Sequence, residues 1–263
     1  MSVSSIKFNK TSSNVDANDI LAAGKTSTTV AKNIALVAKA TKSVPFLSLI
    51  AAPFAISLNV ISAKQWIHLS SLSKRLKDKT YCVSQAISQV TALVAEVIKP
   101  FLVISGLASR RLDKSYLLFT QKIMPPVLLV IEMLQFVCAG WSLARTSLEY
   151  QNFKKNGVHL PHSRNELATH LFKETYMPYH MNLEGCDKLE VQSKLKKGIR
   201  VSMINKSLQV VASAIAISAA ALLILNPVGL TVTSIALITS STIISLTPYV
   251  INKILAEKKV VAM

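Results

Sequence analysis

Glycine is scarce in this chain, and so are the loops that most phosphate-binding and catalytic motifs require. Only 7 of the 263 residues are glycine. The sequence contains no P-loop, no glycine-rich dinucleotide fingerprint, and no Gly-x-Ser-x-Gly, His-Glu-x-x-His or Cys-x-x-Cys pattern. It therefore predicts a protein that is not an enzyme, with no catalytic residue and no cofactor.

Acidic residues are also few, so the chain is strongly basic. There are 13 Asp and Glu against 30 Lys and Arg, which gives a formal net charge of +17. No helix-turn-helix, zinc-finger or RNA-binding signature accompanies the basic residues, so nucleic acid is not the expected partner. Because the lysines cluster beside apolar runs, the expected polyanion is an anionic lipid surface.

Cysteine is too rare to hold the fold together. Cys82, Cys138 and Cys186 are odd in number and far apart, which excludes a disulfide framework and indicates free thiols in a reducing compartment. The amino-terminal residues contain no continuous apolar core, so no cleavable secretory leader is expected.

Charge is absent altogether from Ser207 to Asn252, although Lys206 and Lys253 stand directly outside this run. Two apolar lobes, Ser207–Leu225 and Leu230–Ile251, would be helices of about 28 and 33 Å. Each is long enough to cross a hydrocarbon core of about 30 Å. Helix-breaking residues separate the lobes: Asn226, Pro227 and Gly229. The run predicts a membrane hairpin whose two ends emerge on the same side.

A buried helical pair inside a soluble bundle is the alternative for the same run. The second lobe is rich in serine and threonine, which fits this alternative. However, soluble helices need a wet face, and neither lobe has a polar stripe. Serine and threonine are also tolerated in lipid when they bond back to helix carbonyls.

Three upstream segments are also apolar. The run 43–63 is long enough to cross, with buried core or an interfacial helix as alternatives. In the run 123–144, Glu132 would be costly at mid-bilayer, which favours a buried helix of a soluble bundle in which Arg145 or Lys122 pairs with Glu132, with a membrane crossing as the alternative. Tyr81 to Ile98 predicts a helix that packs within the molecule, with a short partner-binding coiled coil as the alternative. Its seam runs at steps of four and three: Val83, Ile87, Val90, Val94, Val97 and Phe101.

The remaining sequence divides by composition. Sparse glycine, abundant Leu, Ile, Val and Ala, and the lack of alternation predict an all-α fold: a bundle of amphipathic helices plus the carboxy-terminal membrane hairpin. We expect a disordered Ser/Thr-rich tail at 1–29, a helical region at 30–150, a polar basic cytosolic segment at 151–206, the hairpin at 207–252 and a basic tail at 253–263. The basic residues that flank the hairpin are Lys194, Lys196, Lys197, Arg200, Lys206, Lys253, Lys258 and Lys259.

Potential metal ligands occur together only between residues 159 and 186. They are His159, His162, His170, His180 and Cys186. Because no zinc-binding spacing accompanies them, they are interpreted as scattered surface residues, and no metal site is predicted.

The bilobed segment with its Asn-Pro-x-Gly turn, the Ser-rich amino terminus and the basic flanks resemble the chlamydial inclusion membrane proteins. The resemblance covers Lys206–Lys253 and, weakly, residues 1–29. It implies export by type III secretion, insertion into the membrane of the vacuole that encloses the bacterium, and helices that face host cytosol. Such proteins act as scaffolds that recruit host factors. The family shares a pattern rather than residue motifs, so no functional residue carries over.

Two other functions remain open at the level of the sequence. The bilobed segment lies nearer the amino terminus in that family, so the chain could instead be a bacterial inner-membrane or membrane-perturbing protein with up to four crossings. A soluble helical bundle that buries the hairpin is the third interpretation. In each case the expected protein partners, host proteins or further copies of the chain, would bind through helices.

Overall fold

The computed structural model describes residues 21, 24–25, 27–29, 31–32, 44–108, 122–157, 166–179, 181–183, 185–225 and 232–257. Within these ranges the regular elements are helices and no strand occurs, which confirms the all-α prediction. The helices with defined bounds are α2 (Val44–Leu72), α3 (Leu76–Ala108), α5 (Met124–Asn156), α6 (Glu166–Tyr176), α7 (Lys188–Leu225) and α8 (Val232–Glu257).

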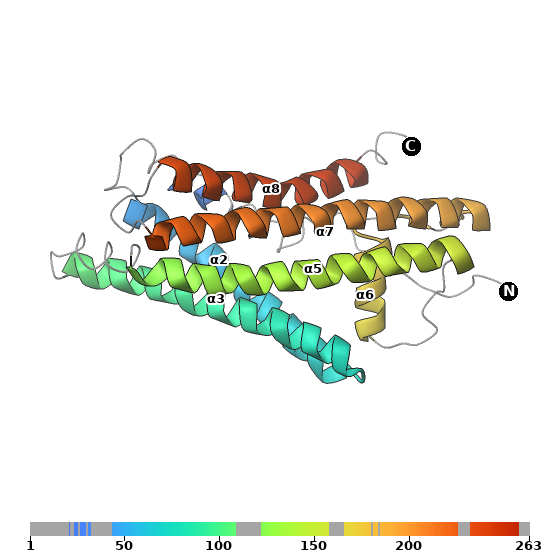
Figure 1. Ribbon diagram of the computed structural model, residues 1–263, viewed down its shortest axis with the longest axis horizontal. Coiled ribbons are helices and arrows are strands. Elements are labelled where there is room, and N and C mark those ends of the chain that lie inside the picture. The colour runs from blue at the N-terminus through green and yellow to red at the C-terminus, as the bar shows by residue number, and fades with distance from the viewer. Residues whose placement is uncertain are drawn as a thin grey trace.

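Five long helices form an elongated bundle, and the short α6 stands across it (Figure 1). The helices α5, α7 and α8 run side by side, while the α2–α3 pair crosses beneath them at an angle. Packing follows the chain in hairpins, with α2 on α3 and α7 on α8, and α5 joins the two by packing on α7 and α3.

The charge-free run forms the expected hairpin of two packed helices. Asn205 Nδ2 donates to Asn252 Oδ1 over 3.0 Å, so the carboxy-terminal part of α8 lies beside the middle of α7, where the charge-free run begins. Deeper in the hairpin, Ser241 Oγ donates to the carbonyl oxygen of Ala212 over 2.9 Å. Other hydroxyls bond back along α8, as lipid-exposed helices require: Thr242, Ser245 and Thr247. The turn residues Asn226, Pro227 and Gly229 lie outside the described residues.

The basic segment and the first apolar lobe belong to one helix. α7 runs for 38 residues from Lys188 to Leu225, so the boundary predicted between residues 206 and 207 falls inside a continuous element. At 1.5 Å per residue, about 28 Å of this helix is basic and about 28 Å is apolar. The helix therefore carries its basic residues away from the apolar band along a straight path.

Small side chains make up much of the interior, although some large ones such as Val103, Leu195 and Ile199 are also buried, and many large apolar side chains point outward. Nine alanines are buried: Ala52, Ala55, Ala63, Ala86, Ala95, Ala139, Ala212, Ala219 and Ala220. Phe101, Ile104, Val137 and Ile243, by contrast, are each more than half exposed. Helices in lipid show this arrangement. Small residues allow the helices to approach closely, and large apolar side chains can stay in contact with lipid tails, which are equally apolar.

Four described helices are long and apolar enough to span a membrane: α2, α3, α5 and α7. At most 28% of the apolar stretch of each is buried within the protein. A water-soluble bundle rarely exposes such a large apolar surface. The protein is a membrane-associated helical protein, and the hairpin is not buried inside a soluble bundle.

The structure corrects two expectations about the upstream segments. The interpretation of 123–144 as a buried helix of a soluble bundle is wrong, because Val130, Met133 and Val137 are exposed. The same holds for the buried-core alternative at 43–63, where Phe46 and Ile50 face outward. In both helices the buried positions are mostly small residues, so hydrophobicity alone did not reveal which face is inside.

The periodic seam of α3 also differs from its prediction. Its branched residues were expected to pack within the molecule, but the whole seam is exposed: Val83, Ile87, Val90, Val94, Val97 and Phe101. α3 instead turns small and polar residues inward, among them Cys82, Ala86, Ser88 and Ala95. The seam therefore faces the surroundings of the protein.

Residues near the amino terminus are more ordered than expected. The described residues between 21 and 32 are helical, although a disordered tail was predicted up to residue 29. Thr28 Oγ1 donates to the Gly24 carbonyl and Thr29 Oγ1 to the Lys25 carbonyl, each over 2.8 Å. The rest of the segment 1–29 lies outside the described residues.

Candidate functional site

One end of the bundle collects the polar and basic residues. The turn between α2 and α3, the carboxy-terminal end of α5, the basic half of α7 and the crossing helix α6 all lie there (Figure 1). The described residues of this end include an ion pair between α6 and α7 that fixes the position of α6.

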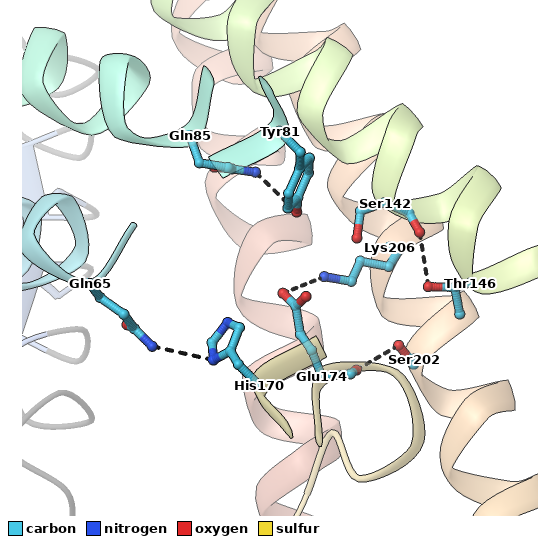
Figure 2. A network of polar contacts seen from close by, with 9 residues as sticks. All are labelled: Gln65, Tyr81, Gln85, Ser142, Thr146, His170, Glu174, Ser202 and Lys206. Carbon is cyan, nitrogen blue, oxygen red and sulfur yellow. Dashed lines mark hydrogen bonds and ion pairs between the residues drawn. The ribbon is translucent and has the colours of Figure 1, made fainter. Parts of the chain in front are cut away.

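The ion pair joins Lys206 to Glu174. Lys206 Nζ lies 2.8 Å from Glu174 Oε1, and the two side chains are 10% and 30% exposed. Burial on its own would raise the pKa of Glu174, but the charge and hydrogen bond of Lys206 hold that pKa below its usual range. Ser202 Oγ also donates to the Glu174 carbonyl oxygen over 3.0 Å (Figure 2). Two residues one turn apart on α7, Ser202 and Lys206, thus contact the backbone carbonyl and the side-chain carboxylate of Glu174.

His170 of α6 lies at the same end of the bundle and faces α2. Gln65 Nε2 lies 3.4 Å from His170 Nδ1 (Figure 2). His170 Nε2 is buried and has no hydrogen-bond partner among the described residues. Burial lowers the pKa of His170, so the ring is neutral at pH 7.

Both tryptophans of the chain lie at this level, on either side of Tyr81. The ring of Trp66 packs edge-on against Tyr81 with centroids 5.6 Å apart, and Trp141 lies 6.4 Å from Tyr81. Gln85 Nε2 donates to the Tyr81 hydroxyl over 3.3 Å. Tryptophan and tyrosine prefer the boundary between lipid and water. The polar layer therefore marks one edge of the membrane-embedded band.

A second polar layer lies at the opposite end of the apolar band and was not predicted. Lys99 Nζ contacts Glu96 Oε1 at 2.6 Å, and their side chains are only 12% and 21% exposed. The neighbouring Ala95 packs on Met124, the first residue of α5. The only sequence signal was the opposite charges three residues apart in an otherwise apolar stretch.

The spacing between the two layers matches a bilayer. Along α3, Tyr81 and Lys99 are about 27 Å apart. Along α7, Lys206 is about 28 Å from Leu225, and along α5, Met124 is about 32 Å from Arg145. A hydrocarbon core is about 30 Å thick, and the lengths along α3 and α5 are close to that value.

The basic residues singled out from the sequence have different environments. Lys196, Lys197 and Lys253 are exposed. Arg200, also exposed, donates from Nε to the Tyr150 hydroxyl over 3.3 Å. Lys206 is buried against Glu174, so its expected role in contacting lipid is wrong. Lys258 and Lys259 lie outside the described residues.

The ammonium group of Lys194 already contacts neighbouring side chains. Its Nζ lies 2.6 Å from Glu190 Oε1 and 2.7 Å from Cys186 Sγ. Lys194 also stands about 18 Å along α7 from Lys206. The distance separates it from the lipid surface that it was expected to contact.

The described residues hold no group of three or more histidine, cysteine or acidic side chains suited to a metal. Of the candidate ligands, His159, His162 and His180 lie outside those residues.

The structure also corrects the expected partners of Glu132. Arg145 contacts Asp78 at 3.4 Å instead, and the charge that acts on Glu132 is that of Lys25.

No protein-family model matches the chain, and neither a curated protein nor a solved structure is significantly similar to it.

Proposed function

We propose that this protein is a non-enzymatic, membrane-inserted scaffold whose polar end faces host cytosol at the membrane of a pathogen vacuole. The observation that carries the proposal is the asymmetry of the bundle. An exposed apolar band about 28 Å thick ends in a layer that carries α6, the aromatic residues and the basic half of α7. Such a protein holds a helical platform at a fixed height above a bilayer.

Basic residues favour the cytosolic orientation of this platform. The short α2–α3 turn and the ends of α5 and α7 carry several of them at the same end: Lys74, Arg75, Lys77, Lys79, Lys154, Lys155, Lys196, Lys197 and Arg200. Positive charge near membrane helices is retained on the cytosolic side.

The platform also offers an apolar side chain that could hold a protein partner. Leu189 is 80% exposed and lies in the polar end section of α7, about 26 Å along the helix beyond Lys206. Lipid does not cover a side chain at this height, so a protein partner is the occupant that would remove it from water. Host factors or further copies of the chain are the partners that we propose.

The vacuole membrane is supported by the resemblance to chlamydial inclusion membrane proteins in the bilobed segment Lys206–Lys253. A bacterial inner-membrane protein is the second candidate, because four described helices rather than one hairpin satisfy the requirements of a span. Location in an infected cell separates the two candidates.

Localisation with a tag at the carboxy terminus tests the proposal directly. We expect the tagged chain at the vacuole membrane, with the tag accessible to antibody once only the host plasma membrane is permeabilised. Retention in the bacterial envelope would reject the vacuole and favour the inner membrane.

Sidedness is tested with single cysteines in a Cys186→Ser background, since Cys82 and Cys138 are buried. Lys77→Cys, Lys197→Cys and Lys253→Cys should all react with an impermeant thiol reagent from the cytosolic side. If Lys253→Cys reacts from the opposite side, α8 does not return to the polar end and the hairpin topology is wrong.

A further inference from the structure

A small polar cavity lies beside the second polar layer, against α2 and α3. Its volume is about 40 Å³. The residues around it include Lys25 and Lys32 from the amino-terminal helical segment, Glu96 and Lys99 from α3, and Ser48 from α2. The cavity is therefore built from three separate parts of the chain.

Positive charge exceeds negative charge in this cavity. Three lysines line it together with one carboxylate, and Glu96 is already in contact with Lys99 at 2.6 Å. Burial and the nearby charge of Lys99 lower the pKa of Lys32 to about 8, so its surroundings disfavour the ammonium form. A bound anion would reverse that penalty, because opposite charge stabilises a buried ammonium group.

The lysines are the hydrogen-bond donors that such an anion would meet. Thr28 and Thr29 also line the cavity, but their hydroxyls donate to helix carbonyls. One buried water requires a cavity of about 10–15 Å³. The cavity of about 40 Å³ therefore has room for about three oxygen-sized atoms. The free oxygens of one phosphate group match that size, and lysine is a common phosphate ligand in proteins.

The height of the cavity suits a lipid phosphate. Lys99 lies about 27 Å along α3 from Tyr81 in the first polar layer, so the two layers face opposite surfaces of a bilayer. Polar headgroups begin where the hydrocarbon core ends. A phosphate in the cavity would thus lie near that end of the apolar band, with the exposed side chains of Phe101 and Ile104 about 3 and 8 Å farther along α3.

We propose that Lys25, Lys32 and Lys99 form a phosphate-binding site at the membrane surface opposite the α6 platform. The site takes the phosphate of an anionic lipid headgroup or a free phosphate ion. It depends on the membrane orientation of the bundle but not on the scaffold role, so a chain found in another membrane would still bind phosphate.

Thermal unfolding of the purified full-length protein in a neutral detergent tests the site. The probes are phosphatidylglycerol, phosphatidylcholine and inorganic phosphate. A ligand that binds the folded state at 100 times its Kd should raise the Tm by roughly 5–10 °C for a chain of this size. We expect this rise with phosphatidylglycerol, little change with phosphatidylcholine, and loss of the rise in the double variant K25Q/K32Q.

The double variant K196Q/K197Q removes the same charge from the opposite end and should keep the full rise. The variant K25R/K32R should also keep it, which shows that loss in K25Q/K32Q reflects missing charge rather than misfolding. If K25Q/K32Q does not fold, the comparison uses the single variant K32Q, whose rise should be smaller than that of the wild type.

The source of the phosphate follows from the remaining arms. A rise with phosphatidylglycerol alone identifies a lipid site, and an equal, lysine-dependent rise with inorganic phosphate identifies a free-phosphate site. An equal rise in the wild type and in the glutamine variant, or no rise with either probe, would overturn the proposal.

Discussion

The α7–α8 and α2–α3 hairpins reach the same membrane-like packing from different sequences. The apolar parts of α7 and α8 contain no charged residue, and their polar groups are amides and hydroxyls that bond to helix atoms. α3 carries Glu96 and Lys99 within its apolar stretch, but the two side chains contact each other. Both hairpins bury small residues and expose large ones. A charge is thus compatible with a membrane helix when its partner lies one turn away and the pair sits near the edge of the band.

The strongest test of this equivalence places an arginine at mid-depth in each hairpin. Val90 lies nine residues from both Tyr81 and Lys99, and Ile217 lies in the middle of the apolar half of α7. Val90→Arg and Ile217→Arg should each weaken insertion by roughly 2.5–3.5 kcal/mol. Insertion is measured as the fraction of the protein that resists carbonate extraction.

An unchanged Val90→Arg variant beside an impaired Ile217→Arg variant would show that α3 does not cross and that only the α7–α8 hairpin is embedded. Release of the wild type by carbonate would contradict membrane insertion of both hairpins. Leu76→Arg, at an exposed position on the polar end, serves as the matched control and should have no effect.

Removing one partner of the buried ion pair should have the next largest effect. Glu174→Ala leaves Lys206 buried without a counter-charge, and the loss of such a partner costs about 3–5 kcal/mol in full burial. Because Glu174 is 30% exposed, we expect about 2–3 kcal/mol, measured as the free energy of unfolding in detergent.

The control for this pair is Glu166→Ala, which removes the contact with His68. That contact is also 2.8 Å long, but its side chains are 58% and 67% exposed. Exposed pairs contribute about 0–1 kcal/mol. Equal destabilisation by the two variants would mean that Lys206 and Glu174 are not desolvated at the membrane edge.

Acidification should loosen α6 before it affects the hairpins. Burial lowers the pKa of His170 in the folded protein, so the unfolded chain binds a proton more readily. Stability should therefore fall as the pH drops below the unfolded value of about 6.5, by up to about 1 kcal/mol near pH 5.5. The lowered pKa of Glu174 adds a loss only below about pH 4.5.

Thermal unfolding at pH 7.5 and pH 5.5 measures the effect, and His170→Gln should remove the part of the difference that comes from this ring. The charged groups that act on His170 are Glu174, Lys206 and Lys173. An unchanged pH dependence in His170→Gln would assign the effect to another residue.

The sequence predicts the parts of this architecture that depend on local composition. The all-α class and the α7–α8 hairpin follow from charge-free stretches with a breaker between them. The pairing of Lys206 with Glu174 depends on a residue 32 positions away, so no local pattern could reveal it. The orientation of the α3 seam was missed for a different reason. Periodicity identifies an apolar face, but only the surroundings decide whether that face is turned inward or toward lipid.

The smallest expected effects concern the basic residues of the polar end, and the straight course of α7 ranks them. Lys253 follows Asn252, which contacts Asn205, so it lies at the edge of the apolar band. Along α7, Arg200, Lys197 and Lys194 lie about 9, 14 and 18 Å beyond Lys206. Headgroups extend about 5–8 Å beyond the hydrocarbon, and electrostatic attraction decays over about 8 Å at physiological salt.

A basic residue close to an anionic surface contributes about 1 kcal/mol. We therefore expect glutamine at Lys253 or Arg200 to reduce the preference for anionic lipid by up to that amount, glutamine at Lys197 to reduce it less, and glutamine at Lys194 to leave it unchanged. The preference is measured with spin-labelled phosphatidylglycerol and phosphatidylcholine around the full-length protein in bilayers, at low and high salt. Equal effects of Lys194 and Arg200 would mean that the basic half of α7 lies along the membrane surface instead of rising from it.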